Sequence, residues 1–293
     1  MQIFSQAGEL RRYVAEKRKQ GQRIALVPTM GNLHEGHYSL IEIARQHADV
    51  VIASVFVNPT QFGPNEDFVC YPRTAEADIA GLDAHACDVL FLPTVQGMYP
   101  SGVQDSVRFV VPTFGDVLEG AIRPGHFDGV ASVVARLFNV VRPDVAVFGQ
   151  KDYQQMLVIQ RLTHDLGYPI EIVGAPIVRE ANGLAMSSRN QYLSAQQREQ
   201  AGVIQRTLQW MREQICAGDR TFAAIETQAQ AQLEQAGLIP DYAVVRRADD
   251  LMEPVGGESA RLIGLIAARL GSTRLIDNLL LDAGNVHDGV TNG

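Results

Sequence analysis

The stretch that decides the fold is residues 24–37, which read IALVPTMGNLHEGH. Its first five residues, 24–28, are a short apolar run, as expected for a buried strand. A polar turn follows at once and contains Gly31, Gly36 and two histidines. An apolar strand that leads through a glycine-bearing turn into a helix is typical of the ligand-binding edge of an α/β sheet.

Working outward, short apolar runs alternate with amphipathic stretches through the first half of the chain. The run 50–57 (VVIASVFV) is β-branched and uninterrupted, which is typical of a parallel strand buried on both faces. Further strands are expected at 89–92, 107–111, 145–148 and 170–173, and helices at 37–48, 74–86, 127–141 and 152–166. This alternation predicts the α/β class, with a doubly wound parallel sheet covered by helices on both faces.

The pattern changes near Ala175-Pro176. Two helices are expected at 195–217 and 221–236, followed by strands at 242–246, 262–270 and 273–281. Helices followed by strands predict a smaller C-terminal α+β domain. We therefore expect a first domain over 1–176, a second over 177–283 that carries the MSSRN loop as a lid, and a disordered tail over 284–293.

The composition of the chain argues against several classes of binding partner. The chain of 293 residues carries 25 Lys and Arg against 33 Asp and Glu, a net charge of −8, which disfavours nonspecific binding to nucleic acid or an anionic membrane. The N-terminus lacks the apolar region of a signal peptide, and no apolar run approaches the ~20 residues that span a bilayer. Cys70, Cys87 and Cys216 form no CxxC pair, so we expect free thiols in a cytoplasmic protein.

The two histidines of the first turn are the strongest chemical signal. His34 and His37 lie three residues apart, so a helix that begins there places both on one side, beside the free N–H groups of its first turn. That arrangement suits a phosphate. A capping turn with two surface histidines is the alternative. A zinc hydrolase is disfavoured, because its motif HExxH differs from the HExH found here and no third ligand cluster stands out.

Two other strands also end in polar residues. Asn58 and Gln61 follow the strand 50–57 and suit hydroxyl or carboxylate ligands, although a polar turn would look the same. Gly149 and Lys151 follow the strand 145–148, where glycine permits close backbone approach and lysine offers a charge to a phosphate. A solvated helix start capped by Asp152 is the alternative there.

The loop LAMSSRN, residues 184–190, gathers three donors to phosphate. Ser187 and Ser188 contribute hydroxyls, Arg189 contributes a guanidinium, and Gly183 just upstream suits a mobile loop. By itself the run also fits a polar linker. Its weight comes from its combination with the His-x-x-His turn and the lysine.

Together these segments resemble the HIGH and KMSKS motifs of the class I nucleotidyltransferase superfamily. The resemblance then narrows to one family within it. Six ordered motifs closely resemble those of the pantoate–β-alanine ligases: PTMGNLHEGH (28–37), VNPTQF (57–62), YPRT (71–74), GHFDGV (125–130), FGQKDYQQ (148–155) and LAMSSRN (184–190). The resemblance runs from about Ile24 to the strands near Leu281.

This resemblance implies a Rossmann-like first domain and an acid–amine ligase. In the family reaction, ATP and pantoate form pantoyl adenylate and pyrophosphate, and the amine of β-alanine then displaces AMP to give pantothenate, or vitamin B5, on the route to coenzyme A. The resemblance also implies Mg²⁺ accompanying ATP, no tightly bound organic cofactor, and a homodimer.

The resemblance also assigns site residues by motif position. The catalytic set is His34, His37, Lys151, Ser187, Ser188 and Arg189. ATP would also contact Pro28, Met30, Gly149, Asp152, Val178 and Met186. Pantoate would contact Gln61, Gln155, Phe62, Val130 and Val134, with Asn58 and Tyr71 as further pocket candidates. β-Alanine would pass Arg123 and His126, and Mg²⁺ would be held by Asp78, with Glu76 second.

Three other functions stay open at this stage. An adenylyltransferase of the same superfamily would share the histidine pair but need another cationic phosphate site, and Gln61 and Gln155 are neutral. An RNA-binding synthetase fragment is disfavoured by the net charge of −8. A nucleotide-binding regulator without turnover is disfavoured by the intact His, Lys and Ser-Ser-Arg sets.

Overall fold

The computed structural model describes residues 1–64, 66–218, 221–255 and 261–281, and the chain divides into two compact units. The first unit comprises residues 1–180 and 185–188; the second comprises 181–184 and the chain from 189 onward. We expected a boundary after residue 176 and the whole MSSRN loop in the second domain. In the structure, 185–188 cluster with the first unit. The expected disordered tail, 284–293, lies outside the described residues.

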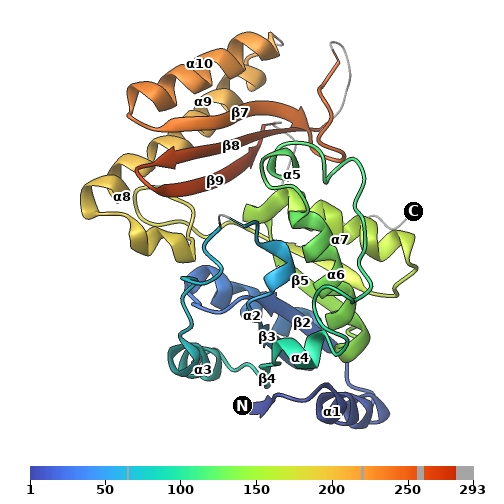
Figure 1. Ribbon diagram of the computed structural model, residues 1–293. Helices are drawn as coiled ribbons and strands as arrows, with labels where there is room; N and C mark the ends of the chain where they lie inside the picture. Colours follow the sequence, from blue (N-terminus) through green and yellow to red (C-terminus); the bar gives the residue numbers. More distant parts are fainter. Residues whose placement is uncertain (65, 219–220, 256–260, 282–293) are drawn as a thin grey trace. The chain divides into compact units, whose positions relative to one another are not determined.

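The first unit is built on a six-stranded sheet in the order β1-β4-β3-β2-β5-β6, with every pair parallel. This confirms the predicted α/β class with a parallel sheet. Figure 1 labels β2, β3, β4 and β5 of this sheet. The strands are β1 (Gln2–Phe4), β2 (Ile24–Thr29), β3 (Val50–Val55), β4 (Val89–Phe91), β5 (Val145–Gly149) and β6 (Glu171–Ala175).

Helices cover both faces of this sheet, as in a doubly wound fold. The helices of the first unit are α1 (Ala7–Lys19), α2 (Glu35–His47), α3 (Ala75–Ala84), α4 (Val95–Met98), α5 (Glu119–Ile122), α6 (His126–Val141) and α7 (Tyr153–Asp165), and short 3-10 turns are η1 (Pro59–Gln61) and η2 (Gln150–Asp152). Helices α2 and α3 share one core cluster with alternate residues of β2, β3 and β5. The intervening strand residues face the opposite side, where α6 packs on β2 and on α1.

The strand order reverses between β2 and β5. From β2 the chain proceeds outward through β3 to β4, whereas β5 pairs with the other edge of β2 and is followed by β6. Such a reversal leaves an opening at the carboxyl ends of the two neighbouring strands, where ligands of open α/β sheets bind. The segments after β2 and β5 are those that carry His34, His37 and Lys151.

The strand expected at 107–111 does not form. The backbone N–H of Phe109 donates to Ser132 Oγ at 2.9 Å, and that of Val111 donates to Asp128 Oδ1 at 2.8 Å. Both acceptors lie on α6, so side chains take the donors that a sheet partner would have used. Val107 and Val110 are each 79% exposed, so the apolar alternation reflects no buried strand face.

The sequence pattern does not predict β1 or α1. Strand β1 has only three residues at the sheet edge, and its burial is low. In α1, just two residues, Leu10 and Val14, are buried among many charged ones. A short edge strand and a narrow apolar stripe give a weak periodic signal.

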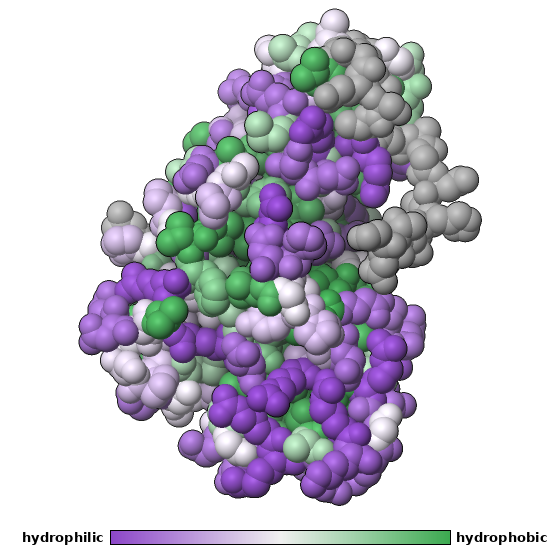
Figure 2. Space-filling model, turned by 90° about the vertical axis from the view of Figure 1, so that its right-hand side faces the viewer, coloured by the Kyte–Doolittle hydropathy of each residue, from purple (hydrophilic) through white to green (hydrophobic). Residues whose placement is uncertain are grey.

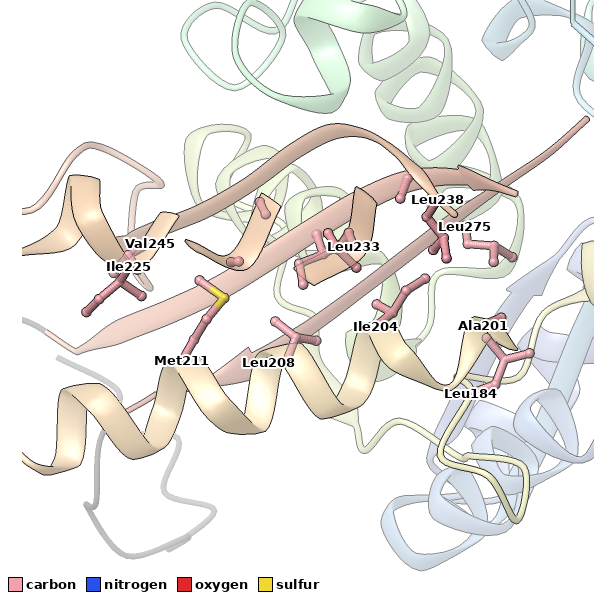
Figure 3. Close-up of a cluster of buried hydrophobic side chains, with 14 of the residues drawn as sticks. Leu184, Ala201, Ile204, Leu208, Met211, Ile225, Leu233, Leu238, Val245 and Leu275 are labelled. Atoms are coloured by element: carbon pink, nitrogen blue, oxygen red, sulfur yellow. The ribbon is translucent and has the colours of Figure 1, made fainter. Parts of the chain in front are cut away.

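The second unit has a three-stranded antiparallel sheet, β7 (Ile239–Arg247), β8 (Leu262–Leu270) and β9 (Thr273–Leu280), in that order. Helices α9 (Val203–Cys216) and α10 (Phe222–Gln235) pack on it. Figure 3 shows Ile204, Leu208 and Met211 of α9 directed toward the strands. Their spacing of three and four residues makes one apolar stripe, so the expected smaller α+β unit is confirmed as an architecture.

The single helix expected at 195–217 is instead two, α8 (Ala195–Ala201) and α9. The amide of Asn182 donates to the carbonyl of Arg198 at 2.7 Å, and Gly202 N–H consequently bonds to Glu199 O rather than continuing the α-helical ladder. A Cβ at Gly202 would also approach Asn182 O at 2.6 Å. A distant amide therefore interrupts a segment whose periodicity is helical throughout.

The face shown in Figure 2 is covered mainly by hydrophilic residues, with smaller hydrophobic areas between them. Among the described residues, no helix has the length and apolar character needed to span a membrane. The three cysteines are free, with Cys87 buried and the other two exposed. Burial raises the pKa of the Cys87 thiol to about 11, so this thiol is inert at neutral pH.

A test of the packing in the first unit uses Gly129 on α6. A Cβ at this position would collide with the Thr60 carbonyl of η1 and lie 2.7 Å from Gln61 Cα. Although alanine favours helices, we expect Gly129→Ala to lower the free energy of unfolding by about 1–3 kcal/mol, measured by urea denaturation. The matched change Gly8→Ala on α1, where nothing lies within 4 Å, should cost nothing. Equal stability of the two variants would contradict this packing.

Candidate active site

The first histidine starts helix α2. His34 is the N-cap residue of α2, and its Nδ1 accepts a hydrogen bond from Gly36 N–H at 3.1 Å. Because Nδ1 is an acceptor, the proton of the neutral ring is on Nε2. His34 therefore caps the helix with one nitrogen and keeps an N–H donor on the other.

His34 and His37 lie together, with ring centroids 4.1 Å apart. Burial and the nearby charge of Lys151 lower the pKa of His34 to about 4, and burial, His34 and Lys151 lower that of His37 to about 3. Both rings are consequently neutral at pH 7. His37 Nδ1 is inaccessible to solvent and has no hydrogen-bond partner among the described residues.

Lys151 comes to the same place from the neighbouring strand. It lies in η2 directly after β5, and its positive charge depresses the pKa of both His34 and His37. That shared influence indicates that the ammonium group lies within electrostatic range of both rings. Gly149 and Asp152 flank it, and Asp152 is exposed. The structure thus brings together the histidine pair and the lysine.

Asp78 shapes the turn that leads to His34. Its carboxylate is 2% exposed and accepts from Asn32 N–H at 3.0 Å, Leu33 N–H at 2.8 Å and Thr74 Oγ1 at 3.2 Å. Gly31 and Asn32 have φ values of 84° and 52°, which are left-handed conformations. The carboxylate therefore stabilises a strained turn by binding its N–H groups.

These contacts do not fit the expected magnesium ligands. Asp78 already accepts three hydrogen bonds, two from the turn and one from Thr74. Glu76 is exposed two residues earlier on α3, which puts it on another side of the helix. In the described part of the chain, no group of three or more His, Cys, Asp or Glu side chains could hold a metal ion. Asp78 is better described as a positioning residue for the turn.

Gln61 is the best-defined of the expected pantoate contacts. It is 8% exposed at the end of η1. Its Oε1 accepts from Asn58 Nδ2 at 3.0 Å, and its Nε2 lies 3.3 Å from Met30 Sδ. Asn58 is itself held by the phenol of Tyr99 at 2.6 Å. Asn58 and Met30 from the expected list therefore lie with Gln61 in one hydrogen-bonded group.

The other expected pantoate residues differ in their surroundings. Val130 and Val134 are buried on α6, and Phe62 packs edge-on against Tyr71, with centroids 5.9 Å apart. On α7, Gln155 is half-buried, and the described residues provide no hydrogen-bond partner for its side chain. Gln155 thus differs from Gln61, whose amide is already oriented by Asn58 and Met30 and keeps one lone pair and one N–H for a ligand.

Some of the groups expected to contact adenine and phosphate already have partners within the protein. Val178 O accepts from Met186 N–H at 2.9 Å, so those two groups are used within the chain. Ser188 Oγ lies 3.4 Å from the phenol oxygen of Tyr71. Ser187 and Ser188 belong to the first unit, whereas Arg189 begins the second.

Arg123 and His126 lie together but face a protein carboxylate. Arg123 donates to both oxygens of Glu66, at 2.6 and 2.7 Å, and its Nη1 lies 3.0 Å from His126 Nε2. The paired fork of the guanidinium is thereby occupied. This arrangement does not favour the expected β-alanine contact.

The sequence reasoning missed Glu66, Tyr99 and Gln154. Buried Gln154 accepts from Glu119 N–H and donates to the carbonyls of Phe114 and Val117, so it holds the segment before α5. Gln154 precedes the apolar Val158 and Leu162 at intervals of four residues, so all three lie on one buried side of α7. This spacing could have indicated that Gln154 is buried. Nothing local in the sequence signals Glu66 or Tyr99, because their partners are 57 and 41 residues away.

Two neutral imidazoles and an ammonium group at the reversal point of a parallel sheet define a nucleotide-binding α/β protein. The family model described as pantoate-beta-alanine ligase matches residues 2–280. The chain belongs to the pantoate–β-alanine ligase family.

Individual relatives agree with this assignment. The chain is 60% identical over 271 residues to a pantothenate synthetase of Xylella fastidiosa strain M23, covering 92% of this chain and 96% of that one. It is similar to the crystal structure of pantothenate synthetase from Thermus thermophilus, with a TM-score of 0.89, 44% identity and coverage of 96% and 99%. A Francisella tularensis pantoate-beta-alanine ligase, complexed with beta-gamma ATP and beta-alanine, has a TM-score of 0.79, 33% identity and coverage of 97% and 99%.

The buried histidines predict a pH-dependent stability. In the unfolded chain their pKa is near 6.5, whereas it is about 4 for His34, about 3 for His37 and about 4 for His126 when folded. Below pH 6.5 the unfolded state therefore binds more protons, so this stability is fully present above pH 6.5 and declines toward pH 4. Each histidine adds a slope of at most about 1.4 kcal/mol per pH unit.

The measurement is urea denaturation between pH 7 and pH 5. His37→Asn should flatten the slope, while the same change at His164, whose side chain is 83% exposed, should leave it unchanged. A wild-type stability that does not vary with pH over this range would contradict the neutral buried histidines.

A second prediction separates positioning from metal binding at Asp78. In Asp78→Asn an amide N–H₂ replaces one carboxylate oxygen and faces a backbone N–H. We therefore expect the free energy of unfolding to fall by about 2–4 kcal/mol. The backbone amides of Asn32 and Leu33 should also exchange faster with solvent. Glu76→Gln is the matched control and should change neither. Restoration of the variant's activity by excess Mg²⁺ would instead support a metal-ligand role.

Proposed function

We propose that this chain joins pantoate to β-alanine at the expense of ATP, with AMP and pyrophosphate released by way of pantoyl adenylate. Family membership supports the overall ligation. The single observation that carries the adenylate route is the grouping of His34, His37 and Lys151 at the carboxyl ends of β2 and β5. In the order proposed, pantoate reacts first and β-alanine second.

In the first step the pantoate carboxylate attacks the α-phosphorus and pyrophosphate leaves. A carboxylate is already ionised near pH 7, so no general base is needed. Catalysis then depends on alignment and on stabilising the charge that gathers on the phosphate oxygens. His34 is suited to this because its Nδ1 is used by the helix cap and its Nε2–H is left as a donor.

Lys151 supplies the positive charge of the site. Because the two imidazoles are neutral, Lys151 is the cation that we assign to the α-phosphate and the departing pyrophosphate. Ser187, Ser188 and Arg189 are proposed to contact the β- and γ-phosphates. Gly149 and Asp152 are proposed for the ribose, and backbone groups near Pro28, Met30, Val178 and Met186 for the nucleotide.

Gln61 and Gln155 are proposed to bind pantoate through its hydroxyl and carboxylate groups. The fixed orientation of Gln61 by Asn58 supports this, because a preorganised amide loses little freedom on binding. Phe62, Val130 and Val134 offer apolar surface for the dimethyl group of pantoate, and Tyr71 packs behind Phe62.

In the second step the neutral amine of β-alanine attacks the activated carbonyl, and AMP leaves. No covalent enzyme intermediate is needed, since the adenylate carries the activation. The adenylate would hydrolyse in water, which gives the loop 184–190 a reason to act as a lid.

ATP is proposed to enter with Mg²⁺ held by phosphate oxygens and water, a form that needs few protein ligands. A cytoplasmic homodimer without a tightly bound organic cofactor remains part of the proposal.

The test is exchange of labelled pyrophosphate into ATP. Pantoate alone should support exchange in the wild type, and β-alanine alone should not, because its amine acts only on the adenylate. Lys151→Ala should lower exchange by at least about a hundredfold, in line with the loss of one charge-stabilising donor, with an unchanged melting temperature.

The change Lys19→Ala at the end of α1 is the matched control and should leave exchange as in the wild type. Release of ADP, or exchange that requires β-alanine, would contradict the adenylate route. A fully active Lys151→Ala variant would remove that residue from the catalytic set.

A further inference from the structure

A chain of buried polar groups ends on the backbone of Gln61. His126, the first residue of α6, is 9% exposed. Its Nδ1 lies 2.8 Å from Gln61 O, and its Nε2 lies 3.0 Å from Arg123 Nη1. A guanidinium only donates, so Nε2 is the acceptor and the ring proton is on Nδ1, where it donates to Gln61 O.

Glu66 completes the chain. Its two carboxylate oxygens accept from Nε and Nη2 of Arg123, and this fork fixes the plane of the guanidinium. Arg123 in turn fixes the tautomer of His126. Burial and the charge of Arg123 lower the pKa of that imidazole to about 4, so it stays neutral across the physiological range.

The side chain of Gln61 is held from the opposite direction. Tyr99 donates to Asn58 Oδ1 at 2.6 Å, and Asn58 donates to Gln61 Oε1 at 3.0 Å. Asn58 also donates to the Gly129 carbonyl of α6 at 3.1 Å. Backbone and side chain of Gln61 are thus fixed by separate groups, which leaves its amide a single orientation.

We propose that Glu66, Arg123 and His126 are positioning residues that set the orientation of Gln61 for pantoate and take no part in binding β-alanine. The inference rests on the proposed assignment of Gln61 to pantoate. The guanidinium of Arg123 already donates two hydrogen bonds to the carboxylate of Glu66. Binding the carboxylate of β-alanine there would first break these two short charge-assisted bonds. Their loss would also release the imidazole that holds Gln61.

Two amide substitutions at position 126 separate the two contacts of the ring. The amide nitrogen of His126→Asn comes near the place of Nδ1 and can still donate to Gln61 O. The amide of His126→Gln comes near the place of Nε2. It can accept the hydrogen bond from Arg123 but cannot donate to Gln61 O. The variants are similar in polarity, so each is the control of the other.

The experiment measures KM values in pantoate-dependent pyrophosphate exchange, which contains no β-alanine, and the KM for β-alanine in the full reaction. His126→Gln should raise the KM for pantoate about tenfold or more and leave those for ATP and β-alanine within about twofold. His126→Asn should stay within about threefold of the wild type for all three. Melting temperatures report whether both variants fold.

A second variant tests the far end of the chain and stands in if His126→Gln does not fold. Glu66→Gln keeps the shape of a side chain that is 25% exposed but weakens the fork, so the KM for pantoate should rise about threefold to tenfold. The change Glu9→Gln on α1 is its control and should leave every KM unchanged.

The outcomes are distinguishable. A raised KM for β-alanine with normal pantoate-dependent exchange would overturn the proposal and support the β-alanine contact. Equal KM values for pantoate in both His126 variants would overturn it as well. Wild-type protein without pantoate-dependent exchange would refute the proposed function itself, and the positioning role with it.

Discussion

The parallel pairing of β2 with β5 is the constraint on which the site depends. Ala25 pairs with Val145 and Leu26 with Ala146, and the strand order reverses across this pair. Both strands are buried on each face, so a slip by one residue would move every side chain into the packing of the opposite face, where it does not fit. The register therefore fixes where the turn after β2 and the turn after β5 emerge, and with them the histidines and the lysine.

Around that pairing, the polar groups of the site are fixed by buried acceptors and donors. The carboxylate of Asp78 holds the left-handed turn before His34, and the Gly36 amide uses one nitrogen of His34. Burial, reinforced by the proximity of Lys151, keeps both imidazoles neutral. Because the two imidazoles are neutral, they do not add positive charge beside Lys151.

The sequence predicts most of the fold because the central strands are continuous apolar runs between clear turn signals. It fails where distant side chains decide the backbone. Ser132 and Asp128 on α6 capture the N–H groups of the segment 107–111, and Asn182 interrupts the helix expected from 195 to 217. Neither contact has a local signature.

The same limit applies to the site. His34, His37 and Lys151 are recognisable because each follows a strand, and the structure does bring them together. The roles expected for Asp78, Arg123 and His126 depend on which groups they face, and each faces protein rather than open space. Residue type and motif position propose candidates, but only three-dimensional contacts separate a side chain that is free to bind a ligand from one that supports its neighbours.

The division of the chain into two units has a consequence for how the molecule can be taken apart. The backbone passes from one unit to the other after residues 180, 184 and 188. A fragment that stops at 180 would lack Met186, whose N–H binds Val178 O, and Ser188 beside Tyr71. A fragment that starts at 189 would lack Asn182 and the buried Leu184. No single cut of the backbone yields both units whole, because each unit includes a short segment that lies, in sequence, beyond residues of the other unit.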